Sequence, residues 1–180
     1  MRCFIAIPMP EEIVDAIDDL QTGLRGANWT TQDTLHLTLV FLGDQHRRSL
    51  EDLDSALIGL DAPAFDLSLS GVDVFGGSKG ARLAYAGVEE SPPLRSLQAK
   101  IEQAARDAEI PIESKRFTPH VTVARWGRGA VASDALGAWI SDNALFRAGP
   151  FPVESYILFR SELSRSGALH TPMAEYALRR

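Results

Sequence analysis

The sequence is poor in cysteine, in long apolar runs and in positive charge. Its one cysteine, Cys3, cannot form an internal disulfide, which excludes a disulfide-stabilised scaffold and indicates a reducing compartment. No apolar run approaches the ~20 residues that a membrane-spanning helix needs. The apolar residues 3–8 are too few for the core of a signal peptide. We therefore expect a cytoplasmic protein with no membrane partner.

The remaining composition is that of an ordinary globular protein. Hydrophobic residues make up 45% of the 180 residues and charged residues 23%, which excludes a mostly disordered or collagen-like chain. A typical domain has roughly 100–200 residues, and no linker or low-complexity segment divides this chain. We predict a single domain, residues 1–180. No apolar stripe is left over for a partner, so we expect a monomer.

The negative charge is concentrated in the first part of the chain. The net charge of −6 argues against a dedicated nucleic-acid-binding protein, which usually has a basic surface. However, residues 1–75 carry −9, whereas residues 76–180 carry +3. Residues 114–133 contain no acidic side chain and four basic ones: Lys115, Arg116, Arg125 and Arg128. An anionic ligand is therefore expected to bind near this segment.

Segments of helical and strand periodicity alternate along the chain. Apolar residues at steps of three and four predict helices over residues 10–24, 50–60, 91–110 and 133–140. Predicted strands cover residues 2–7, 34–42, 65–74, 81–88, 117–125, 153–163 and 170–178. Hairpin signals at residues 76–80, where Lys79 is expected in solvent, and at 164–167 favour antiparallel sheet with helices packed on it. The predicted fold class is α+β.

Two of the predicted strands contain the same short pattern, His-x-Thr between apolar residues, at 35–39 and 119–123. The period of two places each histidine and its threonine on one face, about 7 Å apart. In the first strand, strict alternation also places Phe41 on the opposite, apolar face. His120 follows His36 by 84 residues, nearly half the chain, as expected for a duplicated half-domain whose copies meet across a pseudo-twofold cleft.

Such a site would bring together two imidazoles and two hydroxyls. Histidine is neutral or charged near neutral pH, so His36 and His120 could act as general acid and general base on opposite sides of one phosphorus atom. The hydroxyls of Thr38 and Thr122 could hold the phosphoryl oxygens. This chemistry needs no metal and no cofactor.

The paired motifs resemble the signature of the 2H phosphoesterase superfamily. The strings LHLTLVFLG and FTPHVTVAR are similar to those of its RNA 2′,3′-cyclic phosphodiesterases, also called 2′-5′ RNA ligases. The start, MRCFIAIPMPEEI, the middle, GVDVFGGSKGARLAYAGV, and the end, LFRSELSRSGALHTPMAEYALR, are similar as well. The resemblance therefore covers nearly the whole chain.

This resemblance implies a two-lobed fold: two antiparallel sheets related by a pseudo-twofold axis, helices outside and a central cleft. It implies hydrolysis of an RNA or nucleoside 2′,3′-cyclic phosphate to the 2′-phosphomonoester, with possible reverse ligation. His36 would be the proton donor to the leaving 3′ oxygen and His120 the proton acceptor from water. Thr38, Thr122 and Arg125 would bind the phosphate. The implied partners are RNA ends or short oligonucleotides.

Other interpretations of the same residues are open. The chain could act on another small cyclic nucleotide or a 2′-5′ oligonucleotide, or bind RNA ends without catalysis. A metal held by both histidines lacks an obvious third ligand. Phe41, Phe117 and Trp126 could stack a base or simply pack in the protein. The other two histidines, His46 and His170, are expected on the surface.

Overall fold

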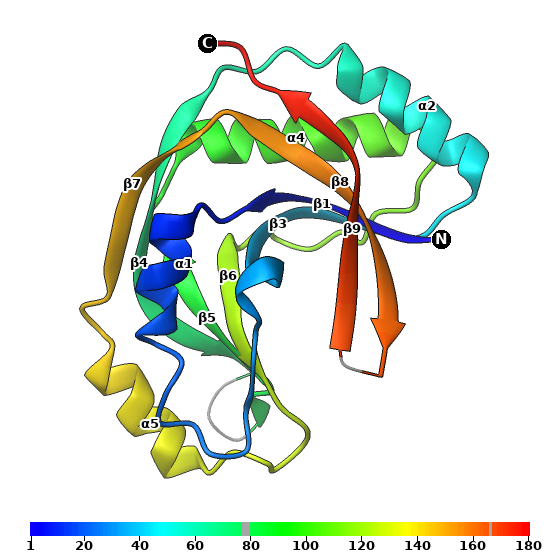
Figure 1. The fold of residues 1–180 in the computed structure, drawn as a ribbon. Helices are drawn as coiled ribbons and strands as arrows, with labels where there is room; N and C mark the ends of the chain where they lie inside the picture. Colours follow the sequence, from blue (N-terminus) through cyan, green and yellow to red (C-terminus); the bar gives the residue numbers. More distant parts are fainter. Residues whose placement is uncertain (77–79, 166) are drawn as a thin grey trace.

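The computed structural model describes residues 1–76, 80–165 and 167–180 (Figure 1). Lys79, expected in solvent within the loop at 76–80, lies outside the described residues, as does Ser166 in the second expected hairpin turn. None of the described helices has the length and apolar character needed to cross a membrane.

The order of elements follows the predicted alternation. The strands are β1 Arg2–Pro8, β2 Asn28–Trp29, β3 His36–Asp44, β4 Phe65–Phe75, β5 Leu83–Val88, β6 His120–Arg125, β7 Arg147–Val153, β8 Ser155–Ser164 and β9 Gly167–Ala177. The helices are α1 Glu11–Asp18, α2 Arg47–Ile58, α4 Pro92–Asp107 and α5 Ser133–Asp142, with a 3₁₀ turn, η1, at Gln32–Thr34.

The described strands form one sheet in the order β7-β4-β5-β6-β3-β1-β8-β9, with the short β2 beside β6. Every pairing between these strands is antiparallel. Its two halves meet where β3 lies next to β6, through the pair Leu37–Val121. The α+β class is thereby confirmed, with one difference: the two expected sheets are the halves of a single sheet.

Helices cover both halves of this sheet (Figure 1). Helix α4 packs on α2 and β3, whereas α1 contacts β7. Ser91 caps the N-terminus of helix α4: its Oγ accepts a hydrogen bond from the Leu94 amide at 3.3 Å and so satisfies one of the free amides of the first turn. Its apolar stripe, with Leu97 and Ile101, is fully buried. The sheet therefore has one face closed by helices.

Strand β7 was not predicted, because Pro150 and Pro152 interrupt its pattern. It pairs with β4 alone and forms one edge of the sheet. Proline is tolerated on an edge strand because its missing amide removes no ladder hydrogen bond when it faces outward.

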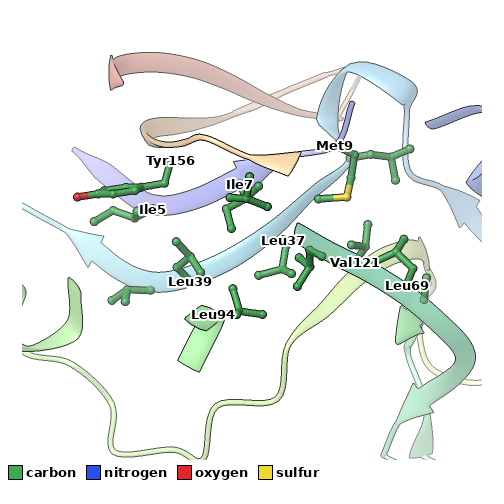
Figure 2. Packing of buried hydrophobic residues seen from close by; sticks show 14 of the residues in the cluster. Ile5, Ile7, Met9, Leu37, Leu39, Leu69, Leu94, Val121 and Tyr156 are labelled. Carbon is green, nitrogen blue, oxygen red and sulfur yellow. The ribbon is translucent and has the colours of Figure 1, made fainter. Parts of the chain in front are cut away.

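The core lies between the helices and the sheet. Figure 2 shows Leu37 and Val121 close together at the junction of the two halves, with Ile7 and Leu94 nearby. Leu37, Val121 and Leu94 are all 0% exposed. The residues on either side of Leu37 in β3 and of Val121 in β6 are only half-buried, so their side chains occupy the other face of the sheet.

Candidate active site

The two His-x-Thr motifs lie side by side on the two central strands. His36 and Thr38 begin β3, and His120 and Thr122 begin β6. The strands are antiparallel and Leu37 pairs with Val121. This register sets His36 opposite Thr122 and Thr38 opposite His120. Side chains that face each other across neighbouring strands have Cβ atoms about 4.5–5.5 Å apart. The four predicted side chains therefore form one cluster.

A β-bulge follows the threonine in each strand. On β3, Thr38 pairs with Ala6 but Val40 pairs with Ile5, so the register shifts by one residue. On β6, the same shift separates Thr122, which pairs with Tyr85, from Ala124, which pairs with Ala84. A bulge reverses the alternation beyond it. In each motif the two residues after the threonine are therefore both buried, as the patterns of β3 and β6 show.

The bulges bring Phe41 and Arg125 to the histidine face of the sheet. Strict alternation predicted the opposite face for Phe41, and this prediction is wrong, since the side chain is 63% exposed. Arg125 occupies the same position in its motif, three residues after the threonine. Its positive charge acts on both His36 and His120.

Both histidines are held in the same way. Nδ1 of His36 lies 2.6 Å from the carbonyl oxygen of Thr34, and Nδ1 of His120 lies 2.8 Å from that of Thr118. A carbonyl only accepts, so each Nδ1 carries the proton and donates it. In the neutral imidazole, Nε2 is then the free basic atom. Each ring therefore presents Nε2 for proton transfer.

Burial determines the charge state of the pair. Burial lowers the pKa of His36 to about 4, although the hydrogen bond to the Thr34 carbonyl raises it. The charges of three neighbours also lower this pKa: His170, Arg125 and His120. Burial also lowers the pKa of His120, which the Thr118 carbonyl raises and Arg125 lowers. Both imidazoles are therefore neutral at pH 7 in the ligand-free protein. Burial also lowers the pKa of the Arg125 guanidinium.

Aromatic rings surround each histidine in similar ways. Phe4 lies 4.9 Å from His36, measured between ring centroids, and stacks on Phe159 of β8. The centroid of Tyr85 lies 5.4 Å from that of His120, and Tyr85 stacks on Phe75 of β4. The sequence pattern did not single out these four rings. Phe4 and Tyr85 come from the strands next to β3 and β6. Their positions beside the histidines can be predicted only when the strand order is known.

The three rings expected to stack a base lie in different surroundings. Phe41 is exposed on the histidine face. Phe117 packs partly buried against the core. Trp126 is 5% exposed and its Nε1 donates to the carbonyl of Ala81 at 2.8 Å. A stacking role does not fit Trp126, because both its ring and its polar atom are already occupied inside the protein.

The basic segment contributes to the site mainly through Arg125. Lys115 forms an exposed ion pair with Glu113, at 2.5 Å. Arg128 is exposed in the turn after β6. Across the described ranges, no group of three or more His, Cys, Asp or Glu side chains could hold a metal ion.

One of the two histidines expected on the surface belongs to this cluster. His46 is exposed, at the start of α2. His170 of β9 instead packs edge-on against His36, with ring centroids 5.2 Å apart. Its surface assignment is therefore corrected. The cause is the strand order, which brings β9 to the same half of the sheet as β3.

Together these groups suit reactions of a phosphate ester. Two Nε2 atoms can take up and release protons, two hydroxyls can donate hydrogen bonds and one guanidinium can balance an anionic charge.

The chain is similar in sequence to several known proteins. Residues 9–165 match the model of the 2′-5′ RNA ligase superfamily. The RNA 2′,3′-cyclic phosphodiesterase of Thermus thermophilus is 34% identical, over 99% of this chain and 91% of that protein. The enzyme of the same name from Geobacillus stearothermophilus is 27% identical over 93% of this chain. The chain spans about half of that longer relative, 54% of its length.

A solved structure has the same fold. The crystal structure of the Thermus thermophilus protein TT0787 matches with a TM-score of 0.81 and 29% sequence identity. The match covers 99% of this chain and 98% of that one.

Proposed function

Because the chain belongs to the 2′-5′ RNA ligase superfamily, with the fold of the 2H phosphoesterases, we propose that it is an RNA 2′,3′-cyclic phosphodiesterase. It would hydrolyse the cyclic phosphate of an RNA end or nucleoside to the 2′-phosphomonoester, without a metal. The observation that carries this proposal is the cross-strand cluster of His36, Thr38, His120 and Thr122. The names of the relatives support the substrate class.

In the proposed reaction, Nε2 of His120 accepts a proton from water as the water oxygen bonds to phosphorus. The bond from phosphorus to the 3′ oxygen breaks, and Nε2 of His36 gives its proton to that oxygen. Thr38, Thr122 and Arg125 bind the phosphate oxygens. These positions would place the water and the leaving oxygen on opposite sides of phosphorus.

The charge of the substrate prepares this proton transfer. The ligand-free imidazoles are neutral, with the pKa of His36 lowered to about 4 by burial. A bound anionic phosphate favours the imidazolium form and raises the pKa again. An imidazolium that is largely buried away from water is a strong acid, which suits the role of proton donor that the resemblance assigns to His36.

Product analysis tests this proposal. The purified chain is incubated with adenosine 2′,3′-cyclic phosphate, with and without EDTA, and the products are separated. We expect the 2′-phosphate at the same rate in both. Production of the 3′-phosphate, or loss of activity that added metal restores, would contradict the proposed reaction.

Three further features belong to this proposal. We propose that residues 1–180 form one domain of two pseudo-symmetric lobes around a central cleft, because both motifs carry the same bulge and the same histidine anchor. The enzyme would be a cytoplasmic monomer. The reverse reaction, 2′-5′ ligation, would use the same residues.

A further inference from the structure

His170 lies beside the proposed proton donor. Its ring meets that of His36 edge to face, at an interplanar angle of 78°. Phe4 lies 4.9 Å from both imidazoles, measured between ring centroids. The three rings therefore form one contiguous aromatic cluster that extends from His36 on β3 to His170 on β9.

The ring nitrogens of His170 have no hydrogen-bond partner among the residues that the structure describes. His36 and His120 each donate Nδ1–H to a carbonyl. Within residues 1–76, 80–165 and 167–180, no hydrogen bond reaches the ring of His170. Its side chain is half-buried, so the ring also meets solvent. A histidine that is fixed by ring contacts alone keeps an N–H group for a ligand.

The charges near His170 are mixed. Burial lowers the pKa of His170; Asp33 of η1 raises it and Arg125 of β6 lowers it. The neutral ring still donates one N–H. A hydrogen bond from that group to an anionic oxygen is stronger than one between neutral groups.

The strand order places His170 on a defined side of the reacting phosphorus. Moving outward from the centre, β6 with His120 is followed by β3 with His36, then β1, β8 and β9 with His170. In the proposed reaction, His120 faces the water and His36 faces the leaving 3′ oxygen. In that reaction the ribose would lie on the His36 side, which is the half of the sheet that also contains β9.

From this geometry we infer that His170 binds the phosphodiester on the 5′ side of the terminal nucleotide. It would thereby favour an RNA end over an isolated nucleoside cyclic phosphate. The inference rests on the proposed function, which fixes the side on which the ribose lies. His170 acts here as a substrate-binding residue for specificity and takes no part in proton transfer.

Two dinucleotides that end in a 2′,3′-cyclic phosphate test the inference. One has a normal phosphodiester linkage and the other an uncharged methylphosphonate at the same place. For the unaltered enzyme we expect a KM about tenfold lower for the charged linkage, the size expected for one hydrogen bond to a charged group.

The variant His170→Phe keeps an aromatic ring against Phe4 and His36 but has no N–H. We expect it to lose the tenfold preference in KM for the charged linkage. His170→Gln, which restores a donor, should recover part of the preference. His46→Phe serves as the control and should leave this preference unchanged, because His46 is exposed at the start of α2.

Two outcomes would overturn the inference: a preference for the charged linkage that survives in His170→Phe, or an equal loss of kcat on both substrates, which would make His170 a positioning residue for His36. Calorimetric binding of the matching 2′-phosphate products separates this test from the proposed function. If no cyclic phosphate is hydrolysed, the proposed function fails. His170 is then judged by whether His170→Phe removes the difference in affinity between the two linkages.

Discussion

Leu37 of β3 pairs with Val121 of β6, and this pair joins the two halves of the sheet. Both side chains are fully buried, while the histidines and threonines on either side of them face the other way. Each imidazole therefore has a hydroxyl of the opposite half as its neighbour. A hydrophobic contact on one face of the sheet sets the alignment of the candidate site on the other.

Replacing Leu37 with alanine should lower the free energy of unfolding by about 2–5 kcal/mol, since it leaves a cavity in a closely packed core. Urea denaturation measures this loss. The control is Leu163→Ala, because Leu163 is 86% exposed and surface substitutions usually stay within about 0.5 kcal/mol. Equal stability of the two variants would contradict the role assigned to the junction.

His36→Ala and His120→Ala should each lower kcat by about 10²–10⁴-fold, the usual contribution of a general acid or base. The far-ultraviolet circular dichroism spectrum should not change, because neither ring is part of the core cluster. His46→Ala should keep full activity. Near-normal turnover in either of the first two variants would exclude the proposed mechanism.

Arg125→Met should raise KM by at least about tenfold, because it removes a positive charge that acts on both histidines. The matched control is Arg128→Met, a loss of the same charge three residues later at an exposed position. If both variants bind the substrate equally, the basic segment acts only through its overall charge and Arg125 has no specific role.

Sequence periodicity predicted the helices, most strands and the four central side chains, because each of these features is local. The bulges were not predicted. A register shift depends on the pairing with the neighbouring strand, with Ile5 and Ala6 opposite β3 and with Ala84 and Tyr85 opposite β6. The residues of β3 or β6 alone do not determine it. Phe41 was placed on the wrong face for this reason.

The contact of His170 with His36 was not predicted for a related reason. It lies 134 residues after His36, in a strand that reaches the site only because β8 pairs with β1.

The prediction that Trp126 contacts a ligand was wrong for a different reason. Its position beside Arg125 suggested a ligand contact, yet the chain turns there and the ring enters the core, where its Nε1 donates to Ala81.

The pH dependence of kcat/KM should differ from that of kcat. The first reports the free enzyme and the second the enzyme–substrate complex. Burial lowers both histidine pKa values in the free enzyme, that of His36 to about 4. A bound phosphate anion raises them. We therefore expect the bell-shaped curve for kcat to be centred at a higher pH than the curve for kcat/KM. Coincident curves would show that the bound substrate does not raise the pKa values of the two imidazoles.

His36 should also make the fold less stable in acid. In the unfolded chain its pKa returns to about 6.5, whereas burial lowers it to about 4 in the folded protein. Above pH 6.5 the imidazole is neutral in both states and has no effect. As the pH falls from about 6.5 toward 4, the unfolded chain binds a proton that the folded protein excludes, so stability is lost over that interval.

At 1.36 kcal/mol per pKa unit, the full loss is about 3 kcal/mol. It is measured by urea denaturation at pH 7.5 and pH 4.5 of the unaltered protein and of His36→Gln, whose side chain does not titrate. Carboxylates titrate alike in both proteins and cancel in the comparison. The unaltered protein should lose more stability than His36→Gln. Parallel losses in the two proteins would mean that His36 becomes protonated in the folded state at its ordinary pKa, and that burial does not hold it neutral.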